Sequence, residues 1–212
     1  ELFAAASVTP GFFVGGSLLV LVLCGLGLVA SFFHLGHPER GWRAAMMWRT
    51  SWLSREVIAL PAFMVSAFAY GFAHWGNLGH TAALGFIGTV LAITLFVCTA
   101  MIYVAVKVLR EWSHPLTVVN FTLLGSASGF CLAAAYAGFA APAVASPLAQ
   151  AAFSLTALSL LMRSASLMRN ARLNPTSTLQ SALGIRHPKI VQKTQGAMGG
   201  SFNTREFFHG KS

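Results

Sequence analysis

Charged residues are scarce in this sequence. They make up 9% of its 212 residues, aspartate is absent, and hydrophobic residues account for 56%. A soluble domain carries about 25% charged residues, so this composition excludes an ordinary soluble enzyme and a disordered chain. Only three cysteines are present, which excludes a disulfide scaffold. The apolar segments do not alternate in polarity, as the strands of a membrane barrel would. The composition therefore predicts an all-α fold, a polytopic transmembrane helix bundle.

Three long stretches lack any charged residue: residues 2–38, 57–106 and 112–162. One spanning helix needs about 20 apolar residues, so each of the two longer stretches should hold two helices joined by a short turn. Glycine and proline mark these turns near residues 76–79 and 140–147. We predict five spans, at about 11–33, 57–75, 82–106, 116–139 and 146–168.

The two ends of the chain differ from this pattern. The first residue is Glu rather than Met, and residues 1–6 resemble the last turns of a preceding span. The segment after residue 172 is too polar to span a membrane. We therefore expect residues 1–172 to form the bundle and residues 173–212 to form a polar cytoplasmic loop or tail that contacts a partner. We also expect the chain to be a fragment of a larger bundle.

All fourteen basic residues fall on one side of this five-span arrangement. They lie in the loop between the first and second spans, in the loop between the third and fourth spans, and from Arg163 onward. By the positive-inside rule this side faces the cytoplasm, which predicts a multi-pass protein of the bacterial inner membrane. The formal net charge of +9 is then a topology signal, and nucleic acid is not an expected partner. Attraction of the basic face to anionic lipid stays open.

Several kinds of redox and transport chemistry lack the residues they need. Cys24, Cys98 and Cys131 are isolated within spans, so we expect no iron–sulfur cluster and no metal site in this chain. No histidine lies in the interior of a predicted span, because His74 and His80 lie at the side opposite the basic residues, and this argues against a haem held by two histidines. The centres of the predicted spans carry no charged residue, which disfavours a transporter.

Three polar side chains stand out where the first span ends and the second begins. His34, Arg40 and Glu56 would lie near the cytoplasmic rim. A quinone site needs a hydrogen-bond donor for a ring oxygen and a titratable group that exchanges protons with water. Histidine suits both roles near neutral pH, Glu56 suits proton exchange, and Arg40 would stabilise negative charge on the ring. Tyr103, at the cytoplasmic end of the third span, is a further candidate.

Each of these residues also has an explanation that involves no ligand. His34 suits a helix end at the membrane interface, and Glu56 suits the first turn of a helix, where its charge complements the helix dipole. Tyr103 suits an aromatic belt. Residues 202–210 mix aromatic and charged side chains, and they either dock a soluble subunit or lie at the interface. The candidate docking residues are Arg43, Arg49, Arg205 and Phe207, of which the arginines also suit topology markers.

Five short motifs resemble one protein family. They are FHLGHPER at 33–40, WLSRE at 52–56, MIY at 101–103, GIRHP at 184–188 and the segment 202–210. Together they are similar to the membrane anchor subunit of dimethyl-sulfoxide-reductase-type molybdoenzymes, the DmsC family, which is related to the polysulfide reductase anchors. The resemblance covers nearly the whole chain. His37 stands where the family commonly has serine, and its role stays open.

The resemblance implies a complex of three subunits. A catalytic subunit holds a molybdopterin, and a ferredoxin-like subunit holds iron–sulfur clusters. The anchor, which has about eight spans and binds no haem, exchanges electrons with menaquinone or ubiquinone. The resemblance also implies that the quinone-site residues of the family fall on His34, Arg40 and Glu56. Because these residues lie on the basic side, we expect the partner subunits to be cytoplasmic.

That arrangement resembles a cytoplasmic sulfite-oxidising complex, in which the anchor passes electrons to quinone and holds no catalytic centre of its own. The reverse direction is the alternative: quinol oxidation feeding a reductase of dimethyl sulfoxide or another sulfur compound in anaerobic electron transport. A passive structural anchor and a transporter are further alternatives.

Overall fold

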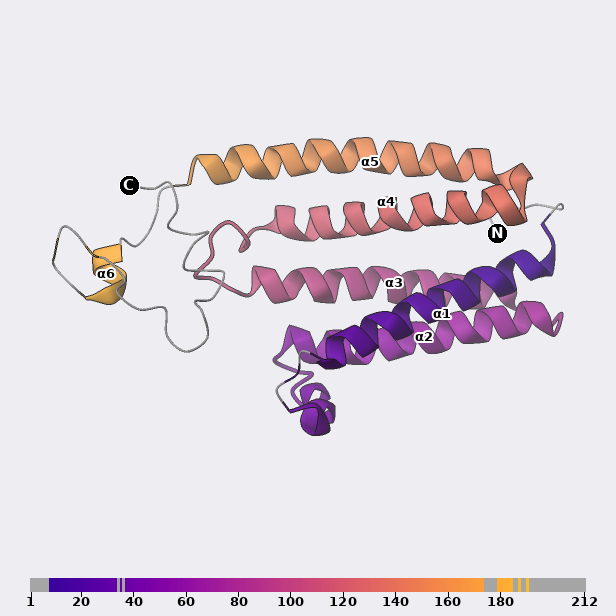
Figure 1. Ribbon diagram of the computed structural model, residues 1–212, viewed down its shortest axis with the longest axis horizontal. Helices are drawn as coiled ribbons and strands as arrows, with labels where there is room; N and C mark the ends of the chain where they lie inside the picture. The colour runs from indigo at the N-terminus through magenta and orange to yellow at the C-terminus, as the bar shows by residue number, and fades with distance from the viewer. Residues whose placement is uncertain are drawn as a thin grey trace. The chain divides into compact units, whose positions relative to one another are not determined.

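The computed structural model describes residues 8–33, 35, 37–173, 179–184, 187 and 190, and every regular element in this part of the chain is helical (Figure 1). The helices are α1 (Pro10–Phe33), η1 (Pro38–Ala45, a 3₁₀ helix), α2 (Trp52–Trp75), α3 (Thr81–Val104), α4 (Pro115–Ala140), α5 (Pro142–Ala171) and α6 (Leu179–Leu183). Helices α1 to α5 are each long and apolar enough to cross a membrane. The prediction of an all-α polytopic helix bundle is confirmed.

The chain divides into two compact units, residues 1–172 and residues 173–212. Within the first unit the long helices pack mainly in chain order, α1 on α2, α2 on α3, α3 on α4 and α4 on α5. Figure 1 shows α3, α4 and α5 side by side, with α1 crossing α2 at an angle. The described part of the second unit contains the short helix α6. Residues 1–6, expected to end an earlier span, lie outside the described residues.

Helix α2 begins at Trp52, five residues before the predicted span. Its start is set by Ser51, whose hydroxyl accepts a hydrogen bond from the Ser54 N–H at 3.3 Å. A serine in this position satisfies one of the backbone donors that have no partner within the helix. The charged residues Arg55 and Glu56, which precede the predicted span, therefore lie within the first two turns of α2.

Helix α5 extends beyond the predicted span 146–168 at both ends, from Pro142 to Ala171. Pro142 is predicted to lie in a turn but begins the helix, because a first-turn residue needs no N–H donor. Pro147 lies inside α5. Arg163, which the charge pattern groups with the basic residues that follow the last span, lies inside the predicted span and inside this helix. This is a correction to the charge-based assignment.

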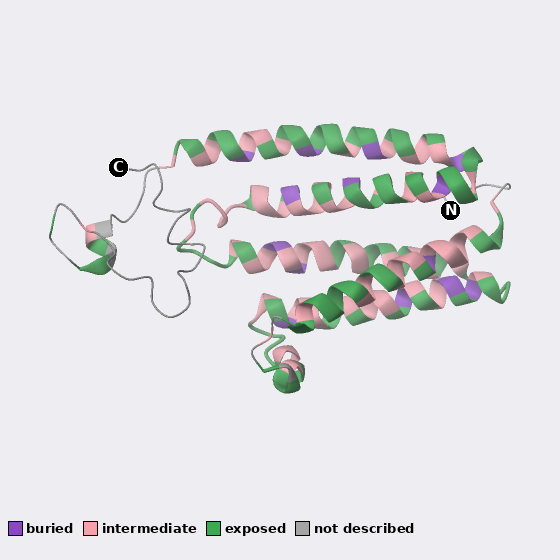
Figure 2. Ribbon diagram, in the orientation of Figure 1, coloured by how far each residue is buried: buried purple, intermediate pink, exposed green. Residues whose placement is uncertain are grey.

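The apolar residues buried in the bundle are small, and many large apolar residues are exposed. Figure 2 shows that most positions of the long helices are exposed or of intermediate burial. The buried apolar residues are Ala59, Ala73, Cys98, Ala100, Ala127, Ala137, Val144 and Ala152. In water, so much exposed leucine, phenylalanine and valine would be an aggregation hazard. In lipid, small residues at helix contacts allow close approach of the backbones, and large side chains meet the acyl chains. The burial pattern therefore fits a bundle that has lipid as its solvent.

Candidate functional site

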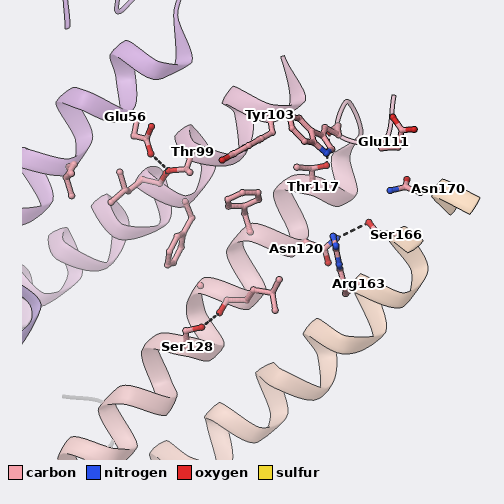
Figure 3. Close-up of a pocket in the computed structure, with 17 residues that line it drawn as sticks. Glu56, Thr99, Tyr103, Glu111, Thr117, Asn120, Ser128, Arg163, Ser166 and Asn170 are labelled. Carbon is pink, nitrogen blue, oxygen red and sulfur yellow. Dashed lines mark hydrogen bonds between the residues drawn. The ribbon is translucent and has the colours of Figure 1, made fainter. Parts of the chain in front are cut away.

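A cavity of about 770 Å³ lies among α2, α3, α4 and α5. Its polar lining consists of Glu56, Thr99, Tyr103, Glu111, Thr117, Asn120, Ser128, Arg163, Ser166 and Asn170 (Figure 3). Its apolar lining includes Leu60, Leu95, Phe96, Phe121 and Leu124. Both the volume and this mixture of an apolar wall with a few polar groups are typical of small-molecule sites.

The cavity lies toward the end of the bundle that carries the α3–α4 loop. Glu56 is four residues after the start of α2, Asn120 is five residues after the start of α4, and Arg163 is eight residues before the end of α5. At 1.5 Å per residue these groups lie roughly 6 to 12 Å inside the helix ends. Lys107 and Arg110 lie in the adjoining loop. A ligand in the cavity would therefore lie close to the end of the bundle that carries the basic α3–α4 loop.

The Glu56 carboxylate on α2 is held by α3. Thr99 Oγ1 lies 2.5 Å from Glu56 Oε1 and 3.0 Å from the carbonyl oxygen of Leu95. A hydroxyl has one hydrogen. Thr99 therefore either donates to an ionised Glu56 or donates to Leu95 while accepting a hydrogen bond from a protonated Glu56. The local geometry accommodates both protonation states of this acid.

Arg55 fixes the linker that leads into α2. Its Nε donates to the Trp48 carbonyl oxygen at 3.0 Å, and its Nη2 donates to the Arg49 carbonyl oxygen at 2.9 Å. Its guanidinium also lies 4.1 Å from the centroid of the Trp52 ring. Since successive residues of a helix point about 100° apart, Arg55 can hold the linker while Glu56 faces α3.

Asn120 joins α4 to α5 in the cavity wall. Its Nδ2 donates to Ser166 Oγ at 2.9 Å, and the residue is only 5% exposed. Its Oδ1 is buried and has no hydrogen-bond partner among the described residues. Buried amide oxygens almost always have a partner. The unpaired oxygen in this wall is therefore an available hydrogen-bond acceptor for a ligand or a water molecule.

Arg163 places a positive charge in the same wall, one helical turn from Ser166. Among the described residues it makes no hydrogen bond and no ion pair. Sequence reasoning missed Thr99, Asn120 and Arg163 as site residues. The signal for Arg163 was present, because a charged residue within a predicted span usually has a functional reason. Thr99 and Asn120 gave no comparable signal, since neutral polar residues are common in spans.

The structure brings Glu56 and Tyr103 to one cavity, and Arg40 is not in its lining. Arg40 lies on η1 with its side chain 61% exposed, and its Nε is 3.8 Å from Glu39 Oε1. His34 lies outside the described residues. Of the predicted quinone-site residues, Glu56 and Tyr103 therefore line the cavity, where they lie with further polar groups from α3, α4 and α5.

The predicted docking residues fall into two groups. Arg43 and Arg49 are exposed in the segment between α1 and α2, and their guanidinium carbons lie 5.5 and 5.3 Å from the ring centroids of Trp42 and Trp48. Arg205 and Phe207 lie outside the described residues.

A second cavity, of about 870 Å³, lies among α1, α2, α3 and α4. Tyr136 on its wall donates a hydrogen bond to the Phe12 carbonyl oxygen at 3.1 Å. Its lining contains no charged residue, so it offers less chemistry than the cavity at Glu56. In the described part of the chain, no group of three or more His, Cys, Asp or Glu side chains could hold a metal ion.

Comparisons with known proteins agree with the membrane architecture. A family described as "DMSO reductase anchor subunit (DmsC)" matches residues 9–185. The chain is 53% identical over 229 aligned positions to a sulfite dehydrogenase subunit of Allochromatium vinosum. That alignment covers all of this chain and 70% of the relative. No solved structure matches the chain.

Proposed function

The chain belongs to the DMSO reductase anchor subunit (DmsC) family. From this premise we propose that its cavity at Glu56 binds a quinone, which exchanges electrons with an iron–sulfur partner subunit. The partner passes electrons to or from a molybdopterin catalytic subunit. The anchor contributes the quinone site and its proton path, and menaquinone or ubiquinone is its exchangeable substrate.

The observation that carries this proposal is the placement of Glu56 and Thr99 in a cavity with an apolar wall. A quinone is an apolar ring with polar oxygens, and its reduction takes up two electrons and two protons. The leucines and phenylalanines of the cavity wall suit the ring, and the Glu56 carboxyl suits the proton transfer. Thr99 supports Glu56 before and after it gives up a proton, because its hydrogen can turn toward either acceptor.

The direction of electron flow is proposed from the relative. It is named as part of a sulfite dehydrogenase, and oxidation of sulfite to sulfate releases two electrons. We therefore propose that electrons pass into quinone and that Glu56 supplies protons to the reduced ring. Glu56 regains a proton from water at the nearby end of the bundle.

The sidedness is proposed from charge. Lys107 and Arg110 lie beside the cavity end, and Arg40, Arg43 and Arg49 lie in the segment between α1 and α2. Basic loops stay on the cytoplasmic side of the bacterial inner membrane. The iron–sulfur and catalytic subunits would then be cytoplasmic. The stacked Arg43–Trp42 and Arg49–Trp48 pairs suit docking of the iron–sulfur subunit, since tryptophan and arginine are enriched in protein interfaces.

The test is Glu56→Gln in the complete complex in its membrane. Glutamine keeps the size of the side chain but cannot transfer a proton. We expect quinone-coupled sulfite oxidation to fall at least tenfold, while sulfite oxidation with an artificial dye acceptor is unchanged.

Glu39→Gln is the matched control, because Glu39 is exposed on η1 and pairs with His37 and Arg40 outside the cavity. It should leave both activities near their original values. Full quinone-coupled activity in Glu56→Gln would overturn the proposal, and so would equal losses in the two variants.

A further inference from the structure

The amide oxygen of Asn120 is a buried polar atom of the cavity wall that has no role in the proposed proton transfer. It lies on the α4–α5 wall, whereas the Glu56–Thr99 pair joins α2 to α3 (Figure 3). Asn120 is buried, and its oxygen has no partner among the described residues. Asn120 is also one of the residues that line the cavity, so a ligand in the cavity would lie against its side chain.

The Asn120–Ser166 bond survives a turn of the amide. In the structure, Asn120 Nδ2 donates to Ser166 Oγ and leaves Oδ1, an acceptor, unpaired. After a half turn of the amide, Oδ1 accepts from the Ser166 hydroxyl and the two N–H donors of Nδ2 turn to where Oδ1 was. Serine permits both arrangements because its hydroxyl both donates and accepts. The wall can thus offer either an acceptor or a donor to the same ligand atom.

A quinone presents both requirements during its reaction. The oxidised ring has carbonyl oxygens, which need hydrogen-bond donors, and the reduced ring has hydroxyl groups, which can donate. The ring also carries its oxygens on opposite sides, so one polar wall serves only one of them. On the basis of the function proposed above, we propose that the Asn120–Ser166 pair binds the ring oxygen that faces away from Glu56, in both the oxidised and the reduced state.

Arg163 is consistent with this assignment. It lies one helical turn from Ser166 in the cavity lining, with no ion pair among the described residues. A positive charge near the ring oxygen favours the electron-rich, reduced form. The α4–α5 wall, with Asn120 and Ser166, would therefore bind the ring. The α2–α3 wall, with Glu56 and Thr99, would transfer the protons.

The test is Asn120→Ala in the complete complex. Two quantities are measured: the KM for decylubiquinone in sulfite-driven turnover, and the Kd for decylubiquinol in the purified complex. Loss of a buried hydrogen bond to the ring should raise both about tenfold. Turnover with a dye acceptor should not change.

Two further variants keep the outcome clear. Thr122→Ala is the matched control on α4, because Thr122 bonds to the Val118 carbonyl oxygen and is not in the cavity lining. It should leave the KM and the Kd unchanged. Ser166→Ala keeps the amide but removes its anchor, so it should raise both constants, and it decides the question if Asn120→Ala fails to assemble.

An unchanged KM in an assembled Asn120→Ala or Ser166→Ala complex would overturn the inference, and so would an effect on only one redox form. A water molecule as the sole partner of Asn120 predicts the unchanged result. If the complex reduces quinone and responds to Glu56→Gln but not to Asn120→Ala, this inference fails and the proposed function stands. If no variant or parent reduces quinone, the proposed function fails.

Discussion

Thr99 shows how one hydroxyl determines the environment of an acid inside a membrane helix. Many serines and threonines of the bundle bond back to a carbonyl oxygen of their own helix, as Thr94 does with Val90 at 2.8 Å. Such bonds keep a polar group satisfied in lipid. Thr99 has the same bond to Leu95 and, in addition, the contact with Glu56 across the helix interface. It can therefore follow a change in the protonation of Glu56 without leaving a group unpaired.

Thr99→Val tests this role. Valine keeps the shape of threonine but removes the hydroxyl, so Glu56 loses its hydrogen-bond partner on α3 in both of its protonation states. We expect quinone-coupled turnover to fall about tenfold, the equivalent of about 1.4 kcal/mol in the barrier, with the dye-coupled rate unchanged. Thr94→Val, which removes a hydroxyl exposed away from the cavity, should change neither rate by more than about twofold. Similar effects of the two variants would refute a specific role for Thr99.

At the level of the helices, the bundle depends on close backbone contacts rather than on a core of large side chains. Helices α1 and α2 meet where Gly71 faces Ser17. A Cβ atom added at Gly71 would lie 2.7 Å from the Cβ of Ser17, closer than two carbon atoms can approach. The glycine is therefore needed for the present spacing of the two helices. By contrast, a Cβ added at Gly138 on α4 would meet nothing within 4 Å.

Gly71→Ala and Gly138→Ala make a matched pair of helix variants. Gly71→Ala should separate α1 from α2 and lower stability by about 1–3 kcal/mol. Gly138→Ala should leave stability unchanged or raise it by up to about 1 kcal/mol, because alanine is the better helix former. Thermal unfolding of the detergent-purified protein measures both. A higher midpoint for Gly71→Ala than for the parent would show that the contact is looser than described.

As a whole, the bundle is organised by the two solvents it meets, lipid around the long helices and water at their ends. Large apolar side chains cover the outside of the long helices, and small side chains fill the contacts between them. The loop that follows α3 is basic, whereas the turn between α2 and α3 carries no lysine or arginine. The long helices place these two segments at opposite ends of α3. This charge asymmetry predicts which end faces the cytoplasm.

Cysteine labelling tests that orientation. Leu78→Cys, in the α2–α3 turn, and Val108→Cys, in the α3–α4 loop, replace exposed apolar residues. Both are made in a parent whose Cys24, Cys98 and Cys131 are alanine. A membrane-impermeant maleimide should label Leu78→Cys in intact cells, and it should label Val108→Cys only after the inner membrane is opened. Labelling of both in intact cells would contradict the alternating spans.

The order of charged and apolar residues along the chain was enough to establish the number of long helices and the nature of their solvent. Nineteen charged residues are too few to cover a soluble domain, and the positions of the gaps between them locate the five long helices. The exact ends of the helices could not be predicted from the charge pattern. The cap at Ser51 and the first-turn Pro142 lengthen α2 and α5 beyond the apolar stretches, and the charge gaps do not register such local backbone effects.

Which polar residues share a cavity depends instead on how the helices pack. His34, Arg40 and Glu56 are grouped in the sequence because they are neighbours along the chain. Packing of α2 on α3 and of α4 on α5 places Glu56 with residues far away in the sequence, including Thr99, Asn120 and Arg163. The physical reason is that a helix presents a residue to one neighbour only. Apolar stretches determine that a helix crosses the membrane, but the contacts of small residues determine its rotation, and with it the side chains that meet.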